Sequence, residues 1–426
     1  MGITIHNGND DEAERGTLSD TLYVLGRRSA GTRGLLQLGR YYALDQSLGS
    51  TVYLDGADPH VVLICGKRGY GKSYTLGTFM EEMTRLDDDV RGNLGILVVD
   101  TLGIFWTSRY GNTRQEELLE RWGYEPQGLN IRLLTAPGQV DDYAAKDIDA
   151  AGFRLRTSEV TPAQWCQLFD AALTEPLGVA VTRAVTSLEP PYGIEDIIAA
   201  LREDQRTPDQ VTGAAENFFE MAAGWNVFSP EGMPLDDIVI GGRVTVLDMS
   251  AYPEELKEVV VAVLARTIFE RRIRERRRDE ERQMQEDDDD AGGFPLVWMV
   301  IDEAQVFLPD EPGMAKDVLI KQWMRQGRQP GVSLLMATQR PSALDPEVLS
   351  HSDMIICHRL TAQQDIEALN TVRPTYMQGS ISEALKKVGA EKGVALIVDD
   401  TSESVHVIKV RPRLSWHGGD EPSALW

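Results

Sequence analysis

The chain has 426 residues, enough for two domains, or for one large domain with an insertion, and for a sizeable core. Its 43 lysines and arginines face 67 aspartates and glutamates, a net charge of −24, so the average surface repels phosphate and any contact with nucleic acid has to be local. The three cysteines are too few for a disulfide framework, and no apolar run approaches the roughly 20 residues of a membrane helix, so we expect a soluble cytoplasmic protein without a membrane segment.

Residues 1–57 combine an acidic tail with a small β-rich unit. Residues 1 to about 16 are polar and acidic, a composition typical of disorder. From Leu18 to Asp55, the short β-type runs TLYVLG, GLLQLG and TVYLD alternate with glycine turns. We expect these runs to form strands ahead of the first long element.

Residues 58–410 carry the pattern of an α/β fold. A buried strand, a helix and a second buried strand are indicated by HVVLIC, GKSYTLGTFMEEMTRL and LGILVVD, the order that builds a mostly parallel sheet. Strand patterns return in RVTVLDMS, PLVWMVIDEA, GVSLLMATQRP, DMIICHRL and GVALIVDD. Between about 140 and 235 the apolar spacing is helical, which predicts a helical insertion, and we expect 411–426 to be a C-terminal tail.

A long helix is predicted before the strand PLVWMVI, because the apolar face of EELKEVVVAVLARTIFERRIRERRRDEERQMQ fades into alternating charge. Six arginines lie between Arg271 and Arg278. Glu275 interrupts them and the acids that follow nearly cancel their charge, which favours a solvated helix over a contact with DNA or a partner. The sequence leaves both readings open.

Residues 64–77, ICGKRGYGKSYTLG, match the pattern GxxxxGK[ST] through Gly66, Gly71, Lys72 and Ser73. Glycines let successive backbone N–H groups point at phosphate oxygens, and the helix that follows adds its positive dipole end. Lys72 would reach the β and γ phosphates of ATP, and the Ser73 hydroxyl would bind Mg²⁺. The alternatives are a glycine-rich turn without a ligand and a dinucleotide site, although the glycines lack GxGxxG spacing. The nucleotide-binding residues that we expect are Gly66, Lys67, Arg68, Gly69, Tyr70, Gly71, Lys72, Ser73 and Tyr74.

Polar residues follow three of the predicted strands. In LVWMVIDEAQVFLP, Asp302 would bind Mg²⁺ and Glu303 would polarise the attacking water. Gln339 ends the next strand, where it could contact the γ phosphate or serve as a structural turn residue. Asp100 ends LGILVVD, at the edge where ligands collect in parallel sheets, and either a site role or loop capping fits it.

Two arginines precede the strand that ends at Gln339. Arg325 and Arg328 are three residues apart in DVLIKQWMRQGRQPG, as they would be at any solvated helix end. Hydrolytic motors need a guanidinium, from their own chain or from a neighbour, to spread the charge of the transition state. One of the two is therefore a candidate catalytic residue.

With these motifs in this order, the chain resembles the HerA family of the FtsK and HerA superfamily of RecA-like hexameric DNA-pumping ATPases. The resemblance covers roughly residues 58–410 and is most specific between Trp298 and Leu360. It implies a RecA-like P-loop core. The roles that it implies are Walker A for Lys72 and Ser73, Walker B for Asp302 and Glu303, the sensor for Gln339, and the arginine acting at a subunit boundary for Arg328.

The chain departs from the family pattern in two places. Family members often have a DPxGE-like run after the second strand, where this chain has Thr101 and Ile104 in place of proline and glutamate. The segment before His60 is also shorter than the usual N-terminal β-barrel, which implies a reduced barrel in residues 1–57.

The resemblance implies a homo-hexamer that hydrolyses ATP with Mg²⁺ and moves DNA through a central channel, working with a nuclease or an NAD-consuming effector in DNA end processing or anti-phage defence. A regulatory or scaffold ATPase of a defence complex and a conjugation or secretion ATPase are the alternatives. No cluster of metal-binding carboxylates stands apart from the ATPase motifs, so any cutting of DNA would fall to another chain.

Overall fold

The structure, a computed structural model, describes residues 2–4, 21–27, 32–43, 45–285, 293–371, 385, 389 and 391–419. Apart from its first strand, the acidic start of the chain, for which the sequence predicts disorder, lies outside the described residues.

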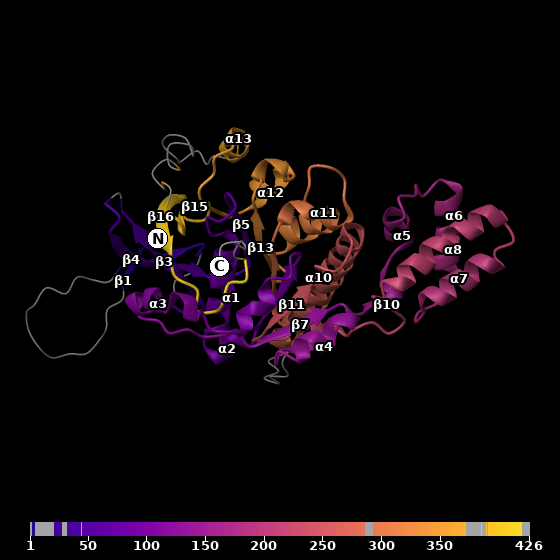
Figure 1. The fold of residues 1–426 in the computed structure, drawn as a ribbon, viewed down its shortest axis with the longest axis horizontal. Helices are drawn as coiled ribbons and strands as arrows, with labels where there is room; N and C mark the ends of the chain where they lie inside the picture. The colour runs from indigo at the N-terminus through magenta and orange to yellow at the C-terminus, as the bar shows by residue number, and fades with distance from the viewer. Residues whose placement is uncertain are drawn as a thin grey trace, which may run out of the picture.

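Within the described residues, one sheet of fourteen strands runs through the fold in the order β1-β2-β4-β3-β16-β15-β14-β5-β13-β12-β6-β11-β7-β8 (Figure 1). From β14 to β8 every neighbouring pair is parallel. The sheet strands are β1 Gly2–Thr4, β2 Thr21–Leu25, β3 Leu35–Tyr42, β4 Leu48–Asp55, β5 Val61–Cys65, β6 Leu94–Asp100, β7 Ile131–Thr135, β8 Asp149–Gly152, β11 Val244–Asp248, β12 Leu296–Ile301, β13 Val332–Thr338, β14 Met354–Cys357, β15 Val394–Asp399 and β16 Ser404–Val410. A mostly parallel α/β fold, as the sequence predicts, is confirmed.

Helices connect these strands. The α-helices are α1 Lys72–Thr84, α2 Asp88–Arg91, α3 Glu116–Trp122, α4 Val140–Ala144, α5 Pro162–Leu168, α6 Pro176–Ser187, α7 Ile194–Glu203, α8 Asp209–Gly224, α9 Leu235–Ile238, α10 Glu254–Gln285, α11 Met314–Val318, α12 Pro346–His351 and α13 Gln363–Thr371. The short turns of other helix types are η1 Phe105–Arg109, η2 Thr113–Gln115, η3 Pro137–Gln139, η4 Thr157–Glu159, η5 Ala304–Val306, the π-helical η6 Leu319–Met324 and η7 Pro341–Ala343. None of the described helices is both long and apolar enough to cross a membrane.

Both faces of the central strands are buried. Val62 and Ile64 of β5 pack in one cluster with Phe79 of α1, whereas Leu63 of the same strand packs in a second cluster with Val259 of α10. Successive side chains of a strand point to opposite faces, so a strand covered on both sides has to be apolar throughout. This is why the sequence shows these strands as continuous apolar runs.

Helices α5 to α8 form a lobe at one end of the molecule (Figure 1), and a parallel pair of short strands, β9 Leu155–Arg156 and β10 Phe228–Ser229, lies where the chain enters and leaves it. Trp165 lies inside the lobe, with its ring centroid 5.1 Å from that of Phe219. The lobe is narrower than the insertion predicted from about 140 to 235, because α4 and β8 still belong to the sheet side of the fold.

The N-terminal strands continue the central sheet, since β3 pairs antiparallel with both β4 and β16. The domain boundary expected at residue 57 stays a prediction.

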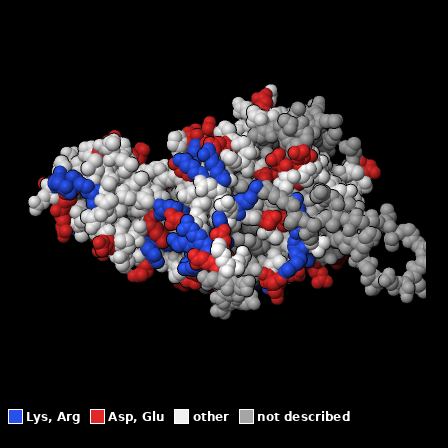
Figure 2. Space-filling model, turned by 180° about the vertical axis from the view of Figure 1, so that it is seen from behind, with Lys and Arg blue, Asp and Glu red and all other residues white. Residues whose placement is uncertain are grey.

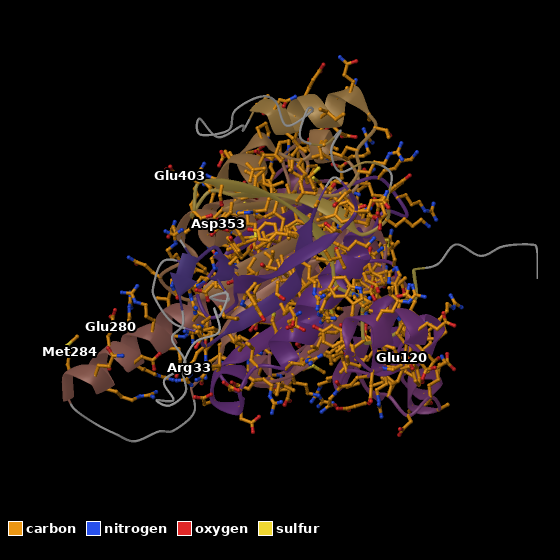
Figure 3. All side chains as sticks on the ribbon, turned by 90° about the vertical axis from the view of Figure 1, so that its left-hand side faces the viewer. Arg33, Glu120, Glu280, Met284, Asp353 and Glu403 are labelled. Atoms are coloured by element: carbon orange, nitrogen blue, oxygen red, sulfur yellow. The ribbon has the colours of Figure 1, made fainter. Side chains whose placement is uncertain are left out.

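On the face that Figure 2 shows, Lys and Arg side chains form several separate groups with Asp and Glu among them. The predicted long helix is α10, and Figure 3 shows its end, with Glu280 and Met284, projecting from the body of the molecule.

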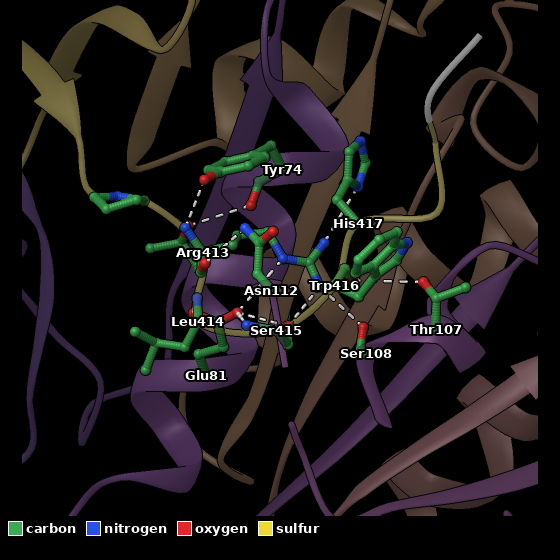
Figure 4. Close-up of polar contacts among 12 residues, drawn as sticks. Tyr74, Glu81, Thr107, Ser108, Asn112, Arg413, Leu414, Ser415, Trp416 and His417 are labelled. Carbon is green, nitrogen blue, oxygen red and sulfur yellow. Dashed lines mark hydrogen bonds and ion pairs between the residues drawn. The ribbon is translucent and has the colours of Figure 1, made fainter. Parts of the chain in front are cut away.

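The described part of the expected C-terminal tail, residues 411–419, packs against α1 (Figure 4). The buried carboxylate of Glu81 accepts hydrogen bonds from the backbone N–H groups of Leu414 and Ser415 at 3.0 and 2.9 Å. It also pairs with Arg411 at 2.8 Å and Arg413 at 3.4 Å, and both guanidinium groups are buried. Burial alone would raise the pKa of Glu81, but Arg411 and Arg413 hold it below its ordinary value.

Candidate active site

The loop between β5 and α1 curls through backbone conformations that favour glycine. Gly69 and Gly71 have φ angles of 79° and 116°. A Cβ on Gly69 would meet no atom within 4 Å, whereas a Cβ on Gly66 would lie 2.7 Å from the Cβ of His358. Helix α1 starts directly after this loop without a side-chain cap, so its first N–H groups are available to an anion.

Side chains of the two strongest motifs meet at this loop, although more than two hundred residues separate them. The Ser73 hydroxyl donates a hydrogen bond to Oδ2 of Asp302 at 2.8 Å. Burial raises the pKa of Asp302 to about 6 against the lowering effect of this hydrogen bond. Lys72 is 6% exposed, and burial lowers its pKa although Glu303 and Asp302 act in the opposite direction. A carboxylate, a hydroxyl and an ammonium group therefore lie together at the start of α1.

The carboxylate of Glu303 is fixed by two glutamine side chains. Gln339 donates to one of its oxygens at 2.5 Å, and Gln305 donates to the other at 2.7 Å. Gln305 is itself oriented by the Thr338 hydroxyl at 2.8 Å. Glu303 has a φ of 53°, an uncommon conformation for a residue other than glycine, and such strain is concentrated at functional sites. The structure thus places the predicted Gln339 against Glu303 and shows Gln305 as a second residue that contacts it. The only sequence signal for Gln305 is a polar residue after IDEA.

His358 supports the loop from the side of β14, and sequence reasoning missed it. Its Nδ1 lies 3.1 Å from the carbonyl oxygen of Val394, which can only accept, so Nδ1 carries the proton. Nε2 then accepts a hydrogen bond from the Thr75 hydroxyl at 2.9 Å. Burial lowers the pKa of His358 to about 4, with Lys72 acting in the same direction. The ring is therefore neutral, and its only sequence signal is a histidine directly after the apolar strand MIIC.

The tip of the loop contacts the residue after His358. The carbonyl oxygen of Arg359 accepts a hydrogen bond from the Lys67 N–H at 2.8 Å. Its guanidinium donates to the Tyr70 hydroxyl at 3.1 Å and lies 5.3 Å from the centroid of that ring. Lys67 and Arg68 are exposed, so their side chains are accessible to a ligand.

Tyr74 is directed away from this group of residues. Its hydroxyl donates to Gln115 at 2.8 Å and accepts from the backbone N–H of Arg413 at 2.6 Å, as Figure 4 shows for Arg413. The hydroxyl of Tyr74 is thus occupied by Gln115 and by the C-terminal segment. Only the backbone of Tyr74 is left to contact a nucleotide.

Asp100 caps the loop after β6. Its carboxylate accepts backbone hydrogen bonds from Leu102 at 3.2 Å and from Gly103 and Phe105 at 2.8 Å. Burial raises its pKa to about 7, against these hydrogen bonds. Of the two alternatives for this residue, loop capping is the one that its contacts support.

Arg325 and Arg328 lie at the amino end of β13, whereas Gln339 follows its carboxyl end. The strand spans about 20 Å at about 3.3 Å per residue, so neither arginine reaches the site of its own chain. Arg325 pairs with Glu347 at 2.5 Å. Arg328 is exposed, and it forms no hydrogen bond or ion pair with any residue that the structure describes.

The chain is similar to known proteins in sequence and in fold. The family model described as "Helicase HerA, central domain" matches residues 36–268, a range that includes the loop and ends before Asp302. The DNA double-strand break repair helicase HerA of Sulfurisphaera tokodaii is 25% identical over 228 residues, which cover 53% of this chain and 42% of the relative. The protein of the same name from Pyrococcus furiosus is 23% identical over 185 residues, which cover 40% of this chain and 33% of the relative. The chain thus spans less than half the length of these curated relatives.

The solved structure of VirB4 from Thermoanaerobacter pseudethanolicus superposes with a TM-score of 0.54 over 90% of this chain and 97% of that one. At 14% sequence identity this likeness concerns the fold alone.

Proposed function

Because the chain belongs to the family of the HerA helicase central domain, we propose that it is an ATP-hydrolysing motor that acts on DNA as a homo-hexamer. The observation that carries this proposal is the 2.8 Å hydrogen bond from Ser73 to Asp302, which joins the phosphate-binding motif of α1 to the acidic end of β12. A serine hydroxyl beside a carboxylate is the donor set that Mg²⁺ uses in P-loop ATPases.

Each residue of the site then has one task. The loop amides and Lys72 hold the β and γ phosphates of ATP, and Ser73 and Asp302 hold Mg²⁺, which neutralises phosphate charge when it is bound. Glu303 orients the attacking water, and Gln339 and Gln305 fix its carboxylate in place.

Arg328 acts on the site of a neighbouring copy. Its position at the amino end of β13 excludes a role in its own site, and an exposed arginine without a partner in the described part of the chain is available to another subunit. A guanidinium with two parallel donors can bridge two phosphate oxygens. A closed ring gives every site such an arginine, and six subunits is the number that the family resemblance implies.

The proposed DNA contacts are confined to a few loops inside the ring. The net charge of −24 makes a broad basic surface unfavourable, and on the face that Figure 2 shows the basic side chains lie in separate groups. The names of the curated relatives, DNA double-strand break repair helicases, support DNA as the substrate.

The finer proposal concerns partners and location. The sequence contains no nuclease motif, so we expect the motor to work with a nuclease or an NAD-consuming effector in DNA processing or defence. The cysteines of the chain, Cys65, Cys166 and Cys357, are free and buried, which fits a reducing cytoplasm.

The test is the ATPase rate with and without duplex DNA. A translocase predicts a rate that rises with DNA, and the rise should shrink as salt is added because the contacts are mostly to phosphate. An ATPase rate that ignores DNA but changes when a co-purifying protein is added would instead identify a regulatory ATPase.

A further inference from the structure

The turn that carries Arg328 is tightly built. It lies between η6 and β13, and the N–H groups of Gly331 and Val332 both donate to the carbonyl oxygen of Gly327, at 3.0 Å each. Gly331 has a φ of 82°, and a Cβ there would lie 2.2 Å from a methyl carbon of Leu296. These contacts restrain the backbone on both sides of Arg328, so the direction of its side chain depends on how this turn is held.

Helix α10 holds the turn. The buried guanidinium of Arg272 donates from Nε to the carbonyl oxygen of Pro330 at 2.8 Å, and a second of its nitrogens donates to the carbonyl oxygen of Phe294. Arg276, one helical turn further, donates to the side chain of Gln329 at 3.0 Å. Both residues that follow Arg328 are thus bonded to one helix.

The same helix also binds the segment before the turn, since the indole N–H of Trp323 donates to the carbonyl oxygen of Ala265 at 2.9 Å. Arg272 bridges two chain segments, the one before β12 and the one before β13. A planar guanidinium can make both bonds at once, whereas the single ammonium group of lysine cannot reproduce this fork.

The other arginines of the run make different contacts from those of Arg272 and Arg276. The buried carboxylate of Glu275 lies within 3.8 Å of Arg271 and Arg278, and also of Arg282, which follows the run. Arg274 and Arg277 are exposed and form no hydrogen bond or ion pair with the described residues. The solvated helix that the sequence favours therefore describes only part of the run, and Arg272 is its buried exception.

We propose that Arg272, assisted by Arg276, is a positioning residue for Arg328: it fixes the turn so that Arg328 meets the nucleotide site of the neighbouring copy. This inference rests on the proposed function, in which Arg328 acts between subunits. A misplacement of about 1 Å in a catalytic group costs on the order of 100-fold in rate, so a loosened turn would matter even in a folded ring.

The first test compares Arg272→Lys with Arg277→Lys, which makes the same change at an exposed site of the same run. Arg272→Lys should lower kcat for ATP hydrolysis on the order of 10- to 100-fold and leave KM for ATP within about twofold, because its own phosphate loop is intact. Arg277→Lys should match the wild type. Gln329→Ala removes the Arg276 contact from the other side and should give a smaller loss of kcat.

Mixed rings separate positioning from general damage. Subunits with Lys72→Ala have an inactive site but a normal Arg328, so adding them to Arg272→Lys should restore part of the activity. A fold-wide defect in Arg272→Lys would impair its own site and would not be rescued. Full activity of Arg272→Lys, or a loss without rescue in rings shown to be mixed, overturns the proposal.

Two further results keep the inference distinct from the proposed function. If Arg328→Ala hydrolyses ATP at the wild-type rate, Arg328 is not a catalytic residue and the proposed function loses its subunit-boundary arginine. If Arg328→Ala is inactive while Arg272→Lys is normal, only the positioning role is lost. Should Arg272→Lys fail to fold, Arg276→Gln and Gln329→Ala decide, and a normal kcat in both contradicts the proposal.

Discussion

Replacing Glu81 by glutamine tests how the C-terminal segment is held on α1, the helix that follows the phosphate loop. The change keeps the shape of the side chain and removes its charge. Glu81 is fully buried, and both of its oxygens accept hydrogen bonds from residues 411–415. Arg411 would keep Glu82, at 2.8 Å, as a counter-ion. Arg413 would have no carboxylate left among its described contacts.

The expected loss of stability follows from that imbalance. Removing one partner of a buried ion pair typically costs about 3–5 kcal/mol, because the remaining charge stays buried without compensation. We expect Glu81→Gln to lower the free energy of unfolding by about 4 kcal/mol, a large share of the 5–15 kcal/mol that is typical of a folded domain.

The assay is urea unfolding followed by circular dichroism, with Glu120→Gln as the matched control. Glu120 is exposed on α3 (Figure 3) and its side chain forms no ion pair in the described part of the chain, so its replacement should change stability by less than about 0.5 kcal/mol. An unfolding midpoint for Glu81→Gln equal to that of the control would refute the reasoning that the buried carboxylate holds the segment.

Two further predictions concern His358 and Arg328. The folded-state pKa of His358, about 4, lies below its ordinary value of 6.5, so the unfolded chain binds more protons between these pH values. Stability should therefore fall as pH drops from about 6.5 toward 4, by up to about 1.4 kcal/mol per pH unit. In urea unfolding at pH 7.5 and 5.0, His358→Gln should lose less stability than the wild type, and an equal loss would contradict the neutral ring. Arg328→Ala should form rings and bind ATP yet hydrolyse it on the order of a thousandfold more slowly, as measured by phosphate release. Lys72→Ala subunits should restore part of that rate, and no rescue in mixed rings would argue against action between subunits.

The parts of the site that sequence reasoning predicts are those with local patterns. Lys72 and Ser73 follow a buried strand and open a helix, and Asp302 and Glu303 follow another buried strand. Each pattern can be recognised within about fifteen residues, and the family that they indicate is confirmed by the match over residues 36–268. Their meeting at one point follows from the parallel sheet, in which carboxyl ends share an edge.

The residues that sequence reasoning missed act through long-range pairing. His358 reaches the phosphate loop because β14 lies beside β5, which its own neighbourhood in the sequence does not reveal. Arg411 and Arg413 lie in the segment that the sequence predicts to be a C-terminal tail. They are nevertheless buried against Glu81, which is more than three hundred residues earlier in the chain. In the sequence, nothing distinguishes Arg272 from its neighbours in the arginine run. The structure distinguishes it, because α10 packs against the turn before β13 and Arg272 bonds to that turn.

The most direct test of the account compares ATP binding and ATP hydrolysis in Glu303→Gln. Glutamine keeps the size of the side chain but offers one acceptor oxygen where the carboxylate offers two to Gln305 and Gln339, and it cannot polarise water as a carboxylate does. Glu303→Gln should bind ATP with Mg²⁺ as the wild type does and release almost no phosphate. Phosphate release at the wild-type rate by the purified variant would contradict the assignment of this site as the centre of ATP hydrolysis.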